Sequence, residues 1–215
     1  MILTSPEVEL LSHTPNPELI LSEAYAVCRL KEPEIARVIK YMKAGHLSPL
    51  EHVVYTFRLK VSRACWSQIE EYRTASHTAQ SHRYWHPDYD KGEGWDFIVP
   101  PELAPGPGKK INILDEIDVH TMFEMFLVCA ETAYRTLIEG FKRKPETARL
   151  ILPMCTAITV IWTQDLRNLL HFWDERCAPE AQWEIRQVAE KTRELVQETL
   201  PNIDLVSFCG DKQGA

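Results

Sequence analysis

Apolar and polar side chains alternate with a period of two between residues 53 and 61. One side of this segment carries Tyr55, Phe57, Leu59 and Val61, and the other carries Thr56, Arg58 and Lys60. Such alternation of aromatic and β-branched residues is typical of a half-buried strand. The density of β-branched residues between Thr156 and Trp162 predicts a second strand, which we expect to be buried.

Helical spacing of apolar residues covers most of the remaining chain. We predict six helices, over residues 17–30, 33–44, 63–73, 115–141, 165–176 and 179–200. Pro17 after Asn16 is an expected start signal, and Gly45 is an expected stop signal. The longest helix, 115–141, has its apolar positions at Phe123, Phe126, Leu127, Ala130, Tyr134, Leu137 and Ile138.

Two segments lack both periodicities. Residues 74–87 are too polar and too rich in aromatic side chains for a regular element, and the glycines and prolines of 92–108 indicate a long surface excursion. No repeat or low-complexity segment divides the chain, so we expect one domain over residues 1–215, with 201–215 as a flexible tail. Many helices and few strands predict an α+β fold in which helices wrap a small sheet.

Composition narrows the classes of partner. With 45% hydrophobic and 26% charged residues the chain resembles ordinary globular proteins, and its net charge of -7 argues against coating nucleic acid or an anionic membrane. No apolar run approaches the roughly 20 residues that cross a bilayer. Residues 1–11 lack a basic segment, so we expect no secretory signal and a cytoplasmic protein. Six scattered cysteines without a CxxC pair predict reduced thiols.

Familiar catalytic and metal-binding signatures are missing from the sequence. Residues 105–110 lack the spacing of a phosphate-binding loop, so we interpret them as a plain loop. His82 and His86 are four residues apart, but Pro87 argues against a helix there, and we expect no metal. Cys65 has no evident partner base and is interpreted as a buried, inert thiol.

Polar side chains are concentrated between Gln68 and Tyr84. These 17 positions hold two each of arginine, serine, threonine, glutamine, histidine and tyrosine. Such donors suit the recognition of phosphate and of bases, and arginine can contact phosphate through two parallel hydrogen bonds. Taken alone, the segment could equally be a solvated loop.

The polar segment belongs to a longer ordered pattern. The successive blocks are His46-x-Ser-Pro-x-Glu-His52, Arg73-x-x-Ser76-x-x-x-x-Ser81-x-Arg83-Tyr84, Ala148-Arg149-x-x-Leu-Pro153, Arg167-x-Leu-Leu-His-Phe172, Arg176 and Ala181-Gln-x-Glu-Ile-Arg186. In this order the blocks resemble the flavin-dependent thymidylate synthases (ThyX family). The resemblance implies a small mixed or antiparallel sheet flanked by long helices. It also implies a homotetramer with active sites shared between subunits.

The resemblance also implies an activity. Family members move a methylene group from methylenetetrahydrofolate to C5 of dUMP and reduce it with a hydride from FAD, which NADPH has reduced. The family's nucleotide contacts match Gln68, Ser81, Arg83 and Arg149, and Gln80 and His82 lie beside them in the sequence. Arg176 matches the arginine that binds the uracil ring and stabilises charge on it, so it is the expected catalytic residue. The expected flavin contacts are Ser48, Arg73, Ser76, Asp165 and His171.

The flavin side departs from the family pattern. Glu71-Tyr72-Arg73 stands where the family has Arg-His-Arg, Thr78-Ala79 stands where it has Asn-Glu, and Asp165 replaces an asparagine. An anion in place of a cation at about 4 Å from a cofactor charge replaces an attraction of about 1–4 kcal/mol with a repulsion of similar size. Two interpretations stay open. The first is a diverged methylase acting on dUMP or a relative such as UMP. The second is a nucleotide-binding paralogue with lost or altered flavin chemistry, for example a sensor or partner subunit.

Overall fold

The computed structural model describes residues 2–28, 30–103 and 118–208. The contacts divide the chain into two compact units, between which the backbone passes repeatedly. Unit 1 contains residues 1–6, 60–67 and 79–159, and unit 2 contains residues 7–59, 68–78 and 160–215. That the whole chain acts as one domain stays a prediction. Loop 105–110 lies outside the described residues.

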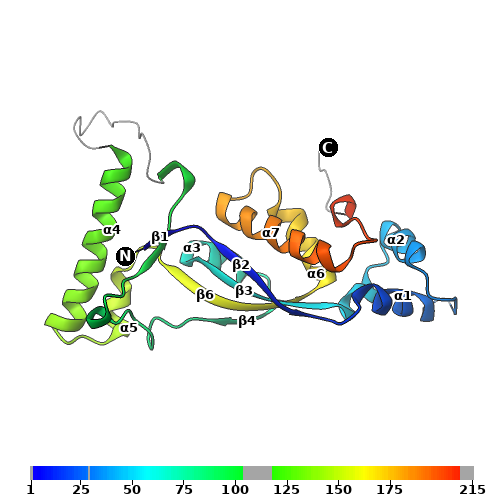
Figure 1. Cartoon of the computed structure of the whole chain (residues 1–215), viewed down its shortest axis with the longest axis horizontal. Helices are drawn as coiled ribbons and strands as arrows, with labels where there is room; N and C mark the ends of the chain where they lie inside the picture. The colour runs from blue at the N-terminus through cyan, green and yellow to red at the C-terminus, as the bar shows by residue number, and fades with distance from the viewer. Residues whose placement is uncertain (1, 29, 104–117, 209–215) are drawn as a thin grey trace. The chain divides into compact units, whose positions relative to one another are not determined.

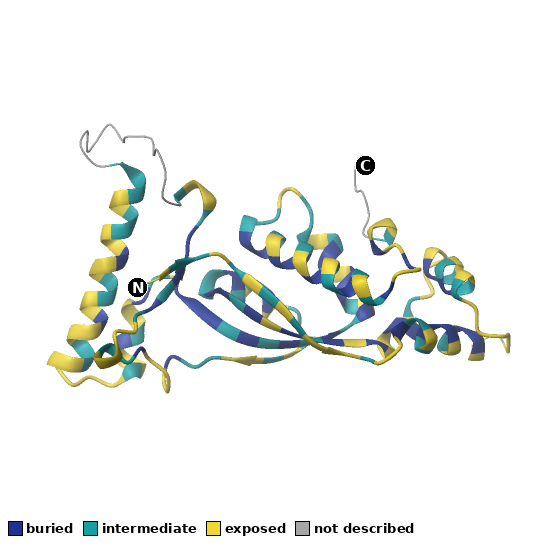
Figure 2. Ribbon diagram, in the orientation of Figure 1, coloured by how far each residue is buried: buried dark blue, intermediate teal, exposed yellow. Residues whose placement is uncertain are grey.

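Unit 2 is built on a four-stranded sheet (Figure 1). Its strands are β2 (Glu7–His13), β3 (Val54–Ser62), β6 (Ala157–Asp165) and β4 (Ser76–Ala79), in the order β2-β3-β6-β4. The ends of β3 and β4 and the beginning of β6 belong to unit 1. Tyr55, Phe57 and Leu59 are fully buried, which confirms the predicted alternation (Figure 2). The Thr56 and Thr163 hydroxyls, 3.0 Å apart, join β3 to β6.

The helices of unit 2 are α1 (Pro17–Val27), α2 (Ile35–Lys43), α6 (Leu166–Arg176) and α7 (Trp183–Thr199). The α6 and α7 helices pack on each other, and the Trp173 indole nitrogen donates to Thr192 Oγ1 at 3.0 Å. Helix α6 turns its apolar side to the core, where the Phe172 and Trp162 ring centroids lie 5.0 Å apart. This packing leaves the polar side of α6 available for a site.

Unit 1 contains a parallel pair of short strands, β1 (Ile2–Thr4) and β5 (Asp96–Ile98), in which Leu3 pairs with Phe97. Its helices are α4 (Val119–Arg135) and α5 (Pro145–Ala148). Their buried side chains surround one core, formed by Trp95, Phe97, Leu127, Tyr134, Ala148 and Leu152. Helix α3 (Arg63–Ile69) crosses the boundary between the units.

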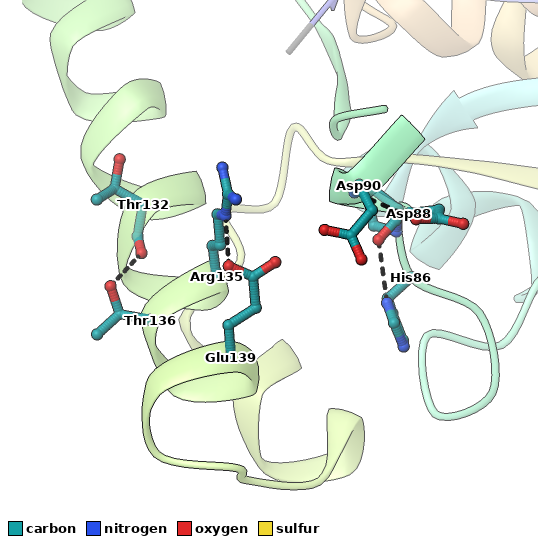
Figure 3. Close-up of polar contacts among 8 residues, drawn as sticks. His86, Asp88, Asp90, Thr132, Arg135, Thr136 and Glu139 are labelled. Atoms are coloured by element: carbon teal, nitrogen blue, oxygen red, sulfur yellow. Dashed lines mark hydrogen bonds and ion pairs between the residues drawn. The ribbon is translucent and has the colours of Figure 1, made fainter. Parts of the chain in front are cut away.

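The end of α4 widens into a π-helical turn, Thr136–Gly140 (Figure 3). The Thr136 hydroxyl donates to the Thr132 carbonyl at 2.8 Å, and Arg135 Nε donates to Glu139 Oε2 at 2.7 Å. The Phe141 amide reaches back to the Thr136 carbonyl at 3.0 Å, five residues earlier. A π-turn of this kind changes which residues face the core, because it shifts the following helical positions around the axis.

The structure confirms the α+β class and corrects several boundaries. Strands β1, β2 and β5 were not predicted, and β4 lies in the segment expected to be irregular. The expected surface excursion over 92–108 contains buried Trp95, Phe97 and Ile98, because β5 joins the core of unit 1. Helix α3 ends at Ile69, and the described part of the longest predicted helix begins at Val119.

The remaining helix predictions are confirmed with ends shifted by a few residues. Ile203 and Leu205 are fully buried, so the beginning of the expected flexible tail is packed. Residues 209–215 lie outside the described residues, and the flexibility of the tail stays a prediction. In the described segments no helix is long and apolar enough to cross a membrane.

Candidate functional site

A pocket of about 1020 Å³ opens in unit 2 beside α6. It is lined by Met42, Leu47, Glu51, Thr74, Asp165, Arg167, Asn168, Leu170, His171, Asp174 and Phe208. Pockets that hold cofactors combine apolar walls with a few polar groups, and their volumes run to about 1,000 Å³. The pocket therefore has the size and the mixed lining of a cofactor site.

The first turn of α6 fixes the polar wall of this pocket. Asp165 is the N-cap residue, and its Oδ1 accepts the Asn168 amide hydrogen at 3.0 Å. Its Oδ2 accepts a hydrogen bond from Asn168 Nδ2 at 2.6 Å. One side of α6 supplies four polar lining residues at helical spacing, Arg167, Asn168, His171 and Asp174.

Charges of both signs line the pocket. Arg167 Nη1 is paired with Glu51 Oε1, which joins α6 to the 3-10 turn Ser48–His52. Across the pocket, Thr74 Oγ1 accepts a hydrogen bond of 3.3 Å from Gln164 Nε2. Gln164 is buried, and its Oε1 has no hydrogen-bond partner among the described residues. Gln164 does not line the pocket, and its contribution there is to hold Thr74.

The predicted flavin contacts are only partly gathered at this pocket. Asp165 and His171 line it directly. Ser48 and Arg73 are exposed and adjoin the lining residues Leu47 and Thr74 in the sequence. Ser76 begins β4 and is not part of the lining.

The predicted catalytic residue, Arg176, is held at the end of α6. Its Nε donates to Tyr72 Oη at 2.8 Å, and Tyr72 Oη donates to Glu175 Oε2 at 2.5 Å. Gln68, at the end of α3, is half-buried. Glu71 and Arg73 are exposed, and within the described ranges neither makes a hydrogen bond or ion pair.

The other predicted nucleotide contacts lie in unit 1. Gln80 forms two hydrogen bonds with Thr159. Its backbone amide donates to the Thr159 carbonyl at 2.8 Å, and its side-chain Oε1 accepts the Thr159 backbone amide hydrogen at 3.1 Å. Ser81 Oγ accepts the Arg83 amide hydrogen at 3.3 Å and so shapes the turn. Arg83 Nη2 lies 3.7 Å from Glu146 of α5, and both side chains are about half exposed.

His82 is buried next to these residues. Burial, together with the nearby charges of Arg63 and Arg149, lowers the pKa of its imidazole to about 4. His82 is therefore neutral at pH 7 and can act as a hydrogen-bonding group, but not as a cation. Arg149 directly follows α5, and Arg83 approaches α5 through Glu146. One chain thus brings His82, Arg83 and Arg149 to the same helix.

A second pocket in unit 1, of about 700 Å³, lies along the end of α4. It contains none of the predicted site residues. Its lining includes three carboxylates, Glu93, Glu131 and Glu139, and one guanidinium, Arg135, which is already paired with Glu139. The unit 2 pocket has a similar charge balance, so what separates the two pockets is that only the unit 2 pocket contains predicted site residues.

Sequence reasoning missed three groups of residues around these sites. Thr74, Asn168 and Asp174 line the unit 2 pocket, and the helical spacing of polar residues on α6 could have identified the last two. Tyr72 and Glu175 hold Arg176, but 103 positions separate them in the chain, and no local pattern connects them. Arg63, whose charge lowers the pKa of His82, could not be identified from a local pattern either, because the two residues are brought together by the fold.

Comparisons with known proteins identify the family. The sequence model of the family described as thymidylate synthase complementing protein matches residues 9–202. Similar proteins include a flavin-dependent thymidylate synthase of Nitratidesulfovibrio vulgaris, 36% identical over 93% of this chain and 86% of the relative. Another, from Clostridium tetani, is 30% identical over 92% of this chain and 84% of the relative. The chain therefore belongs to the flavin-dependent thymidylate synthases, a family of methyltransferase enzymes.

Proposed function

We propose that the protein methylates C5 of a pyrimidine nucleoside monophosphate, dUMP or a relative such as UMP, in the cytoplasm. The observation that carries this proposal is the unit 2 pocket. It keeps a volume of about 1020 Å³ and a mixed polar lining although Glu71, Tyr72, Thr78 and Ala79 replace the family signature. A pocket of this size and lining supports the retention of a cofactor.

The residues present fit FAD. Arg167, Asn168, Thr74 and His171 offer hydrogen-bond donors for pyrophosphate and ribose oxygens. Thr74 is held in place by a hydrogen bond of 3.3 Å from Gln164 Nε2 to its Oγ1. Arg167 can meet a phosphate only if it loosens its pairing with Glu51. Ser48, Arg73, Ser76 and Asp165 complete the proposed set, with Ser76 the least supported by position.

In this proposal the nucleotide is held by Gln68, Gln80, Ser81, His82, Arg83, Arg149 and Arg176. Arg83 and Arg149 bind the phosphate, and neutral His82 supplies a hydrogen-bonding group without adding charge. Gln80 has its side-chain oxygen engaged by Thr159, so only its amide nitrogen is available to a ligand. Arg176 contacts the uracil ring and stabilises negative charge that develops on it.

Three small molecules complete the proposed reaction. Methylenetetrahydrofolate is the source of the one-carbon group, FAD when reduced supplies the hydride, and NADPH reduces FAD. The chain's own contribution is to bind, orient and stabilise charge, because this reaction needs no nucleophile from the enzyme. The burial of Cys65 is consistent with that division of roles.

We propose a homotetramer as the active form. The supporting observation is the exposed apolar side of α4, where Met122, Met125, Phe126 and Val128 are 41–54% exposed (Figure 2). Exposed apolar groups clustered on one helix are typical of surfaces that become covered by another protein. The resemblance implies that Arg83 and Arg149 reach one nucleotide from different subunits. Within one chain, Arg83 lies near Glu146 of α5 and Arg149 directly follows this helix. The sharing of sites between subunits stays a prediction.

The alternative function is nucleotide binding without methylation. It is favoured by the charge of the unit 2 pocket, where the carboxylates of Glu51, Asp165 and Asp174 outnumber the guanidinium of Arg167. Calorimetric titrations with dUMP, UMP and FAD, each alone and in pairs, separate the two functions. The methylase proposal predicts that FAD binds and stays with the protein through gel filtration. Nucleotide binding without any flavin binding would favour the alternative.

A further inference from the structure

The phenol of Tyr72 lies between two charged groups at the end of α6. Arg176 Nε donates to Tyr72 Oη at 2.8 Å, and Tyr72 Oη donates to Glu175 Oε2 at 2.5 Å. The Arg176 guanidinium carbon also lies 5.5 Å from the centre of the Tyr72 ring. Both hydrogen bonds involve an ionised partner, and such bonds are shorter and stronger than those between neutral groups.

Tyr72 is itself held in one orientation. Its ring meets buried Phe172 edge-on, with centroids 5.1 Å apart and planes at 83°. A second edge contact joins it to His171 at 6.2 Å. Its backbone amide donates to the Ile69 carbonyl at 3.1 Å, which continues the end of α3. The phenol oxygen therefore occupies a fixed place beside α6.

A fixed phenol limits what Arg176 can do. Its Nε–H is engaged, and across the described segments no other residue bonds its two terminal amino groups. Those amino groups form the edge of the guanidinium that recognises planar acceptors. A free arginine loses rotamer entropy when it binds a ligand, and an arginine that is already held loses less.

We infer that Tyr72, backed by Glu175, is a positioning residue that holds Arg176 ready for the nucleotide. The inference rests on the proposed function, because it takes Arg176 as the group that meets the pyrimidine ring. It gives a role to the tyrosine that stands where the family signature has histidine. The neutral Tyr72 phenol also lies between the Glu175 carboxylate and Arg176 Nε, so that the carboxylate does not form a direct ion pair with this nitrogen.

The Tyr72 phenol stays uncharged across neutral pH. Burial raises the pKa of Tyr72 to about 12, and the hydrogen bond to Glu175 raises it as well. The phenol is therefore protonated at pH 6–9.

The test is Tyr72→Phe, which keeps the ring against Phe172 and removes only the hydroxyl. We expect the Kd for dUMP or UMP to rise about tenfold, as for the loss of one hydrogen bond to a charged group. FAD affinity is expected to change less than twofold. Glu175→Gln is a second variant, with a smaller loss of nucleotide affinity. The matched control is Tyr55→Phe, which removes another phenol of unit 2, one that lies 2.9 Å from Thr199 Oγ1. The control is expected to leave nucleotide affinity unchanged.

A double-mutant cycle with Arg176→Lys distinguishes positioning from a general structural effect, because lysine has no Nε–H for the phenol. If Tyr72 acts through Arg176, Tyr72→Phe adds no further loss to the lysine variant. Unchanged nucleotide affinity in Tyr72→Phe, or losses that add fully in the double variant, would overturn the inference while the proposed function stands. A wild-type protein that binds neither dUMP nor UMP would instead overturn the proposed function, and the inference with it.

Discussion

The imidazole of His82 lies edge-on to the indole of Trp95, with ring centroids 4.8 Å apart and planes at 65°. His82 is 5% exposed, and its Nε2 has no hydrogen-bond partner among the described residues. A charged imidazolium is poorly solvated in this place, which is why the pKa is lowered to about 4. The contact therefore links the core of unit 1 to the predicted nucleotide segment.

We predict that His82 makes folding pH-dependent. Its folded pKa of about 4 lies below the ordinary value of 6.5, so the unfolded chain binds the proton more readily. The contribution to the free energy of unfolding is full above pH 6.5 and is lost as the pH falls from 6.5 toward 4, by at most about 3 kcal/mol. Urea denaturation of wild type and His82→Phe across this range measures the difference. Parallel curves for the two proteins would contradict the prediction.

We predict that Arg83→Ala and Arg149→Ala each weaken dUMP or UMP binding by about 1.5–3 kcal/mol, the usual range for hydrogen bonds to charged groups. Calorimetric titration provides the measurement. Arg135→Ala is the matched control, because Arg135 is an arginine of unit 1 that is paired with Glu139 away from the predicted residues. Titration curves of both site variants that match the control would remove the nucleotide assignment.

We predict that Glu71→Arg strengthens FAD binding by about 1–3 kcal/mol, since one repulsion is removed and one screened attraction is added. Restoring the family pair, Glu71→Arg with Tyr72→His, is expected to strengthen FAD binding by a similar amount and to weaken nucleotide binding, because it removes the phenol that bonds Arg176 and Glu175. Adding Ala79→Glu is expected to help further if that carboxylate organises the flavin site. Fluorescence titration of FAD gives the affinities. A changed melting temperature with unchanged FAD affinity would mean that Glu71 only packs or caps the end of α3.

We predict that the apolar side of α4 lies at a subunit interface. Phe126→Glu is expected to lower the oligomeric mass measured by light scattering, because burying a carboxylate without a partner is costly. Leu19→Glu, which changes an exposed apolar residue of α1, is the control and is expected to keep the wild-type mass. A wild-type protein with the mass of one chain would contradict both the interface and the tetramer.

The predicted elements succeeded where a local pattern reflected burial. The alternation of β3 and the helical spacing of α6 follow directly from one buried face, so both were read correctly. Strand β1 was not predicted because it has three residues and gains its stability from pairing with β5, where Ile2 pairs with Asp96. Strand β4 was not predicted because it lies at the edge of the sheet and its residues are mostly exposed, so no alternation of apolar and polar residues marks it.

The candidate site was predictable only in part. Of the expected flavin contacts, Asp165 and His171 line the unit 2 pocket, and of the expected nucleotide contacts Arg83 lies near Glu146 of α5, which Arg149 follows. Their binding roles stay predictions. The bonds of Tyr72 to Glu175 and Arg176 were not predictable, because they join positions more than one hundred residues apart. Tertiary contacts of this kind leave no periodic signal in the sequence.

We propose above that this chain methylates a pyrimidine nucleotide and does not merely bind one. The most direct measurement is mass spectrometry of the nucleotide after incubation of the purified protein with dUMP or UMP, methylenetetrahydrofolate, FAD and NADPH. We predict a product heavier by one CH₂ group. Its formation requires every component, and the Arg176→Lys variant forms less of it. A nucleotide that binds in calorimetry but leaves this mixture with its mass unchanged would contradict the claim.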